Sequence, residues 1–326
     1  MTTAGAPPRP TAPRPASTGP AKPDRRFPTP ATLLQNWLLG KPKPVTGPPQ
    51  SPQIAMAATA LTILTALLFG FVAQITLVGT LKHNRDQKVA YADLRLAMAN
   101  GITPVGPTDG KPIPKGTPVA RMEIPAIGVK EVVFEGTTAG VLRSGPGHLR
   151  DTVMPGEAGT SVVLGRRMAY GGPFSHIASL KKDDEIKFVT GQGESTYKVI
   201  DVRWPGDPGP PVAPARLTLM TTSGSRFAPS DAVRVDADLT GTASPAATPA
   251  FTANTLPRDE WPLHGEPGGL KGAVGWGILL LGAAVGVVWL RTNWGRWQAW
   301  LVGVPTLGFL GISVADHAVR LLPNLL

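Results

Sequence analysis

Three stretches of the chain are long runs of apolar residues without charge. They cover residues 54–81, 272–290 and 297–315. A helix needs about 20 apolar residues to cross a bilayer, and each run reaches or approaches that length. The third run contains Pro305 and several glycines, which leaves a re-entrant or interfacial helix open for it. The pattern predicts one N-terminal and two C-terminal transmembrane helices.

Between the first and second runs, the pattern changes to short strands separated by turn residues. The apolar stretches of this region lie at 120–124, 132–134, 161–164, 185–189, 196–202, 217–221 and 232–237. Strands of this length and spacing predict an all-β barrel or sandwich of ordinary domain size. We therefore expect a mainly β domain over residues 119–239.

The remaining segments are polar and rich in Pro or Gly. Residues 1–53 cannot bury enough apolar surface to offset the entropy of ordering, so we expect a disordered basic tail. Residues 82–118 predict a helical stalk, which ends near Asn100, and then a Pro/Gly linker. Residues 240–271 predict a second linker, rich in Pro, Ala and Thr.

The chain carries a net charge of +10, from 32 Lys and Arg against 22 Asp and Glu. Much of this excess lies in the N-terminal tail beside an apolar run, where basic residues orient a membrane protein, so we do not expect a nucleic-acid partner. The tail and the short basic loop 291–296 should share the cytoplasmic side. The β-domain then lies outside, in a multi-pass plasma-membrane protein.

The residue inventory excludes several kinds of chemistry. The sequence contains no cysteine, which rules out disulfides, thiol catalysis and thiolate metal sites. The acidic run 183–185 is typical of a solvated turn, and the segment 165–172 lacks the Gly-Lys-Ser/Thr ending of a phosphate loop. We expect neither a metal ion nor a cofactor.

The β-domain carries several specific motifs in a fixed order. They are MEIPAIGV at 122–129, GPGH at 145–148, MPGEAG at 154–159, VLGRRMAYGGPF at 163–174, LKKDDEI at 180–186 and RLTLMTT at 216–222. Together they resemble sortases, the cell-wall transpeptidases of Gram-positive bacteria. The fourth is similar to the Gly-His-Arg…Tyr-Gly-x-Pro-Phe segment of the actinobacterial class E sortases. The resemblance covers about residues 119–239 and implies a closed β-barrel.

The same resemblance implies that the catalytic residues have been replaced. Sortases use a cysteine nucleophile, a histidine that protonates the leaving amine and an arginine that stabilises the oxyanion. The matching positions are Thr222, Arg166 and Ala232. A threonine hydroxyl needs a base, and a guanidinium stays protonated, so we expect no catalytic residue here. His148 and His176 are the histidines that lie near enough in sequence to be considered as a base.

A binding site is the alternative use for such a cleft. Arg234 lies two residues after Ala232, on the same face of a strand, so it and Arg166 are candidates for a cationic pocket that accepts an acidic or carboxylate-bearing segment. Two other outcomes stay open: Arg234 pairs with Asp231 or Asp236, or Arg166 pairs with a nearby acid and plugs the groove. The candidate binding residues are Arg166, Arg234, Thr222, Tyr170 and His148.

Three functional hypotheses follow. The first is a membrane-anchored, extracytoplasmic sortase-like pseudoenzyme that binds a cell-surface polypeptide or a membrane protein without cleaving it. The second is an atypical transpeptidase or hydrolase that uses Thr222 or Ser223. The third is a scaffold whose three spans assemble a surface-protein complex.

Overall fold

The computed structural model describes residues 52–107, 111–224, 229–293 and 296–326. Nearly all of the expected N-terminal tail, residues 1–53, lies outside the described residues, and so does the middle of the basic loop 291–296.

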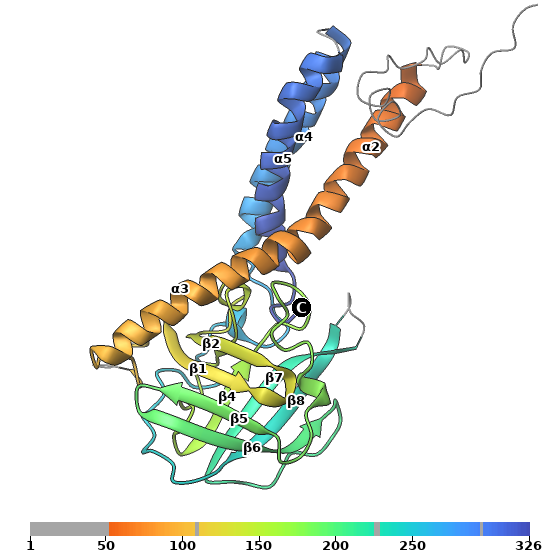
Figure 1. Cartoon of the computed structure of the whole chain (residues 1–326). Helices are drawn as coiled ribbons and strands as arrows, with labels where there is room; N and C mark the ends of the chain where they lie inside the picture. The colour runs from red at the N-terminus through yellow and green to blue at the C-terminus, as the bar shows by residue number, and fades with distance from the viewer. Residues whose placement is uncertain (1–51, 108–110, 225–228, 294–295) are drawn as a thin grey trace, which may run out of the picture. The chain divides into compact units, whose positions relative to one another are not determined.

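In the described part of the chain, strands β1 to β8 close into a barrel (Figure 1). Their order around the barrel is β1-β2-β3-β4-β7-β8-β6-β5, and the pairs β2–β3 and β4–β7 are parallel. The strands are β1 Pro118–Ile124, β2 Val129–Glu135, β3 Gly147–His148, β4 Gly159–Leu164, β5 Glu185–Thr190, β6 Gly193–Arg203, β7 Ala215–Gly224 and β8 Pro229–Leu239. Short 3-10 turns occur at η2 Pro125–Ile127, η3 Val141–Arg143, η4 Ile177–Ser179 and η5 Arg258–Glu260.

The prediction of a closed β-barrel with one N-terminal and two C-terminal apolar helices is confirmed. Each predicted apolar stretch lies within a strand. Strand β3 was not predicted, because its two residues are too short to show an alternating pattern.

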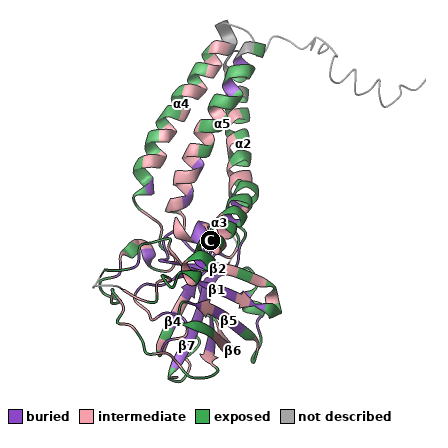
Figure 2. Cartoon of the chain, turned by 60° about the vertical axis from the view of Figure 1, so that its left-hand side comes forward, coloured by how far each residue is buried: buried purple, intermediate pink, exposed green. Residues whose placement is uncertain are grey.

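The barrel interior is filled by apolar side chains that alternate along the strands. On β7, Leu217 and Leu219 point into this core, whereas Met220 belongs to a separate apolar cluster. The rings of Phe188 and Tyr197 meet edge to face, with their centroids 6.0 Å apart. Figure 2 shows the buried residues gathered in the strands.

The helices outside the barrel are long and apolar. Helix α2, Pro52–Ala73, continues through the π-helical turn η1, Gln74–Val78, into α3, Gly79–Ala99. The C-terminal pair is α4, Gly269–Asn293, and α5, Arg296–Leu321. Candidate membrane spans are found in these three helical regions. Side chains such as Phe69, 77% exposed, fit a lipid environment better than water.

Two polar segments that flank the barrel pack on it. On α3, which lies beside β1 and β2 in Figure 1, Ala90 and Leu94 are buried against Val132 and Phe134. After β8, Ser244 pairs with Glu157 in an isolated β-bridge. These contacts add to the barrel the helix α3 and the segment 240–268 between β8 and α4, which we call the covering segment. The covering segment reaches the candidate site through Leu256.

Candidate functional site

The end of β7 and the facing part of β8 bring two of the matched positions together. Thr222 lies directly opposite Ala232 in the antiparallel register, and Met220 lies opposite Arg234. Residues two apart on a strand share a face, so all four belong to one side of this strand pair. Thr222 and Ala232 are buried, at 4% and 2% exposure.

The third matched position, Arg166, reaches the same place on the loop after β4. Strand β4 runs parallel to β7, and the Gly165 amide continues the pairing by donating to the Met220 carbonyl at 3.0 Å. The Thr221 hydroxyl donates back to the Gly165 carbonyl at 2.8 Å. The residue after Arg166, Arg167, donates from Nη1 to the carbonyl oxygens of Thr222 and Gly224, at 3.4 and 3.2 Å. The fold therefore places the positions matched to the sortase trio around one strand end.

Arg166 is a fully buried cation held by backbone oxygens. Its Nη2 donates to the Ala139 carbonyl at 2.9 Å, and Nη1 donates to the Leu326 backbone oxygen at 3.4 Å. Its Nε finds no hydrogen-bond partner among the described residues. The ion pair with a nearby Asp or Glu that the sequence left open is not formed in the described part of the chain. Arg166 thus points into protein rather than into an open groove.

The electrostatics of Arg166 follow from this burial. Burial lowers the pKa of the Arg166 guanidinium to about 10, and the like charge of Arg143 acts in the same direction, against Tyr170 and Glu266. The group is still protonated at neutral pH. It can donate hydrogen bonds, but it cannot accept a proton from Thr222.

Tyr170 lies between two arginines. Its ring centroid is 5.3 Å from the Arg166 guanidinium carbon and 5.8 Å from that of Arg143. Arg143 is also paired with Asp316 of α5. Burial by itself lowers the pKa of Arg143, but Asp316 and Tyr170 outweigh it and the net direction is upward. Tyr170 is therefore part of a contact between the barrel and α5.

The last described residues, 323–326, fill the space beside this strand face. We call them the tail segment. Leu325 is fully buried in the apolar cluster that contains Met220 and Ala232, and its carbonyl oxygen accepts the Arg167 amide at 3.1 Å. Asn324 is also fully buried. Sequence reasoning missed this segment, because an uncharged Pro-Asn-Leu-Leu after an apolar helix carries no recognisable motif.

Neither Arg234 nor His148 is among the hydrogen-bond partners of Arg166 in the described part of the chain. Arg234 is half-buried and forms no ion pair with Asp231 or Asp236, so the pairing considered from the sequence does not occur. Asp236 pairs instead with Arg203 and accepts from the Thr218 hydroxyl at 2.7 Å.

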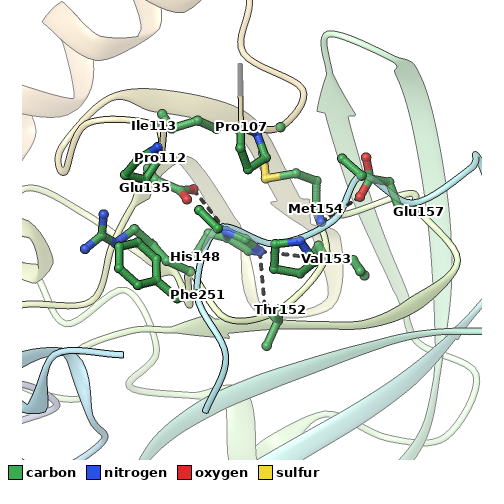
Figure 3. A pocket seen from close by; sticks show the side chains of 15 residues that line it. Pro107, Pro112, Ile113, Glu135, His148, Thr152, Val153, Met154, Glu157 and Phe251 are labelled. Atoms are coloured by element: carbon green, nitrogen blue, oxygen red, sulfur yellow. Dashed lines mark hydrogen bonds and ion pairs between the residues drawn. The ribbon is translucent and has the colours of Figure 1, made fainter. Parts of the chain in front are cut away.

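His148 lies on β3 and lines a small cavity with Glu135, Thr152 and Val153 (Figure 3). Its Nδ1 lies 3.0 Å from Glu135 Oε2, and its Nε2 lies 2.9 Å from the Val153 carbonyl oxygen and 3.2 Å from the Thr152 hydroxyl. Burial lowers the pKa of His148, but Glu135 and the Val153 carbonyl raise it more, so the net direction is upward. The adjoining cavity of about 20 Å³ has room for roughly one water molecule. His148 is thus a buried structural group.

Comparison with known proteins finds a family match for the barrel region. Residues 122–226 match the sortase domain family. Sortase D of Bacillus subtilis is 33% identical over 82 residues, a match that spans 25% of this chain and 40% of that protein.

Solved structures similar to this chain are also sortases. Sortase E of Streptomyces avermitilis is 30% identical, with a TM-score of 0.35, over 40% of this chain and 91% of that one. The Sortase D5 transpeptidase of Clostridium perfringens is 24% identical, with a TM-score of 0.40, over 48% and 99%. The chain thus contains a sortase-family domain, built as a closed β-barrel and accompanied by three helices apolar enough to span a membrane.

Proposed function

We propose that this protein is a membrane-anchored sortase-type protein that binds a polypeptide without cleaving it. The observation that carries the proposal is the identity of the residues around the β7 strand end: Thr222, Arg166 and Ala232 stand where the resemblance puts the catalytic cysteine, histidine and arginine. None of the three can take over the role of the residue it replaces.

The chemistry at this strand end argues against turnover. A threonine hydroxyl becomes a useful nucleophile only when a base removes its proton. Arg166 is protonated, and His148 is hydrogen-bonded to Glu135 and to the Val153 carbonyl and shares no hydrogen bond with Thr222 in the part of the chain that the structure describes. Ala232 offers no donor to a developing oxyanion. The exposed His176 lies on the turn before η4 and shares no hydrogen bond with Thr222 among the described residues.

Burial of the β7 strand end supports the absence of cleavage. A catalytic cleft must admit substrate to its nucleophile, whereas Thr222 is 4% exposed and its neighbour Ala232 packs in the cluster that holds Leu325. The cluster also includes Leu256, from the covering segment after β8. The space beside the strand end is therefore filled by apolar side chains of the same chain.

We place the barrel on the extracytoplasmic side of the plasma membrane. The basic tail and the loop 291–296 are then cytoplasmic, as the positive-inside rule favours. The expected partner is a cell-surface polypeptide or a membrane protein. A scaffold role for the helices is a second candidate, favoured by the ion pair between Arg143 of the barrel and Asp316 of α5.

A turnover assay tests the proposal. The purified full chain is incubated in detergent with a library of sorting-signal peptides and an amine acceptor, and products are measured by mass spectrometry. We expect no cleavage and no transfer. Turnover that disappears in Thr222→Ala but persists in the matched variant Thr240→Ala, an exposed threonine, would favour the atypical enzyme instead.

A further inference from the structure

The tail segment is bound the way a recognised peptide is bound. It begins one residue after Leu322, which follows the end of α5 at Leu321, and reads Pro-Asn-Leu-Leu at 323–326. Its contacts come from residues far away in the sequence, and they include both hydrogen bonds to its backbone and an apolar cluster that buries one side chain. In peptide recognition, backbone bonds supply affinity and side-chain pockets supply specificity.

Asn324 is matched by acceptors from two parts of the chain. Its side-chain amide donates to the Thr137 carbonyl at 2.8 Å and to the Trp261 carbonyl at 3.0 Å, and its backbone amide donates to the His264 carbonyl at 3.0 Å. Aspartate has no such donors and would bring a buried charge, and alanine would leave both acceptors unpaired. Of these three residues, only asparagine supplies both donors, and its Oδ1 has no hydrogen-bond partner among the described residues.

Leu325 supplies the apolar anchor. Its side chain is fully buried with Leu142, Leu164 and Leu256. Its carbonyl oxygen accepts the Arg167 amide at 3.1 Å, and the next backbone oxygen, of Leu326, accepts from Arg166. Two donors from the loop after β4, the Arg167 amide and the Arg166 guanidinium, thus hold the backbone of the tail segment. The apolar cluster buries the Leu325 side chain.

We infer that the surface beside the β7 strand end, together with Thr137 and the covering segment, is a peptide-recognition site for an Asn-Leu pair, and that the tail segment is its resident ligand. This inference rests on the proposed function and names the ligand of that site. It gives Arg166 a binding role at the position that matches the sortase histidine. A tethered ligand acts at an effective concentration of order millimolar, so a free peptide should enter only after the tail segment has left.

A thiol-accessibility experiment tests the inference in the full chain. Because the native sequence has no cysteine, Leu325→Cys gives a single thiol in a fully buried position. We expect it to react with a thiol reagent far more slowly than Glu194→Cys, at an exposed position. Adding Asn324→Ala removes two hydrogen bonds and should speed the reaction about tenfold. The matched control Asn254→Ala, at an exposed asparagine, should leave the rate unchanged.

Peptide binding supplies the second test. A fluorescent peptide with the sequence of residues 316–326 is added to a chain truncated after Leu322 and to the intact chain. We expect binding to the truncated chain alone, weakened about tenfold when alanine replaces the peptide's asparagine. Failure of the folded truncated chain to bind it, or binding indifferent to that alanine, would refute the recognition site.

The thiol assay decides alone if the truncated chain does not fold. Equal rates at positions 325 and 194, or no effect of Asn324→Ala, would overturn the inference. Neither test measures turnover, so each can fail independently of the proposed function. Transpeptidase activity would refute the proposed function, whereas the two tests above would still decide whether the tail segment is a bound ligand.

Discussion

His148 Nδ1 lies 3.0 Å from Glu135 Oε2, and both side chains are buried within the barrel. The pKa of His148 is raised above its ordinary 6.5, because Glu135 and the Val153 carbonyl outweigh the opposing effect of burial. A histidine whose pKa is higher in the folded state than in the unfolded state contributes stability, and this contribution is fully present when the pH is below the unfolded-state pKa. That stability is lost as the pH rises through the folded-state value.

We therefore predict that the free energy of unfolding falls as the pH rises above about 6.5. The measurement is thermal unfolding of the full chain between pH 6 and 9. His148→Gln should flatten this dependence, whereas His176→Gln, at an exposed position, should keep it. If the free energy of unfolding of His148→Gln changed with pH as it does in the parent protein, His148 would not be the group responsible.

A second prediction concerns the buried ion pair that fixes the covering segment after β8. Arg150 Nε and Nη2 donate to the two carboxylate oxygens of Glu260, at 2.9 and 2.5 Å, and Glu260 is fully buried. Glu260→Gln removes the counter-charge of Arg150 and also that of Lys115, whose Nζ lies 3.1 Å from Glu260 Oε1, so we expect destabilisation of about 3–5 kcal/mol. Thermal unfolding measures it.

The neighbouring Asp259 provides the control for that change. It contacts Lys115 at 3.1 Å with its side chain 30% exposed, so Asp259→Asn should cost no more than about 1 kcal/mol. Equal losses from the two substitutions would show that burial of Glu260 is not the cause.

A third prediction is that Thr222→Cys alone does not create a transpeptidase. The new thiol has an ordinary pKa of about 8.5, and Arg166 can lower it but cannot protonate the leaving amine. Removing several members of a catalytic unit costs little more than removing one, so restoring one of three should recover little. Measurable amine transfer by Thr222→Cys, absent in Thr222→Ala, would contradict this.

The fourth prediction concerns topology. Single cysteines at Thr18, Asn293 and Glu194 are treated on intact cells with an impermeant thiol reagent. If the barrel is extracytoplasmic, only the Glu194→Cys variant should be labelled, because the other two positions flank basic cytoplasmic segments. The absence of native cysteine removes background. Labelling of the Asn293→Cys variant would overturn this orientation.

The sequence by itself determined the class of fold and suggested where a site lies. Long uncharged runs depend only on local composition, so the apolar helices could be predicted. Alternation along a strand reports which face is buried, so the stretches within β1, β2 and β4 to β8 could be predicted as well. The ordered sortase-like motifs indicated Thr222, Arg166 and Ala232 as the positions to examine, and the barrel brings these residues to one strand end.

Only the tertiary structure decided what surrounds those residues. Asn324 is held by Thr137, 187 positions earlier, and Glu260 by Arg150, 110 positions earlier. Neither contact leaves a periodic signal, because each depends on a single polar group that meets its partner only after the barrel has closed. Burial of Arg166 depends in the same way on Ala139 and Leu326. The resemblance in the sequence implies that the catalytic trio is replaced, but only long-range packing shows that the chain's own tail segment occupies the space beside those positions.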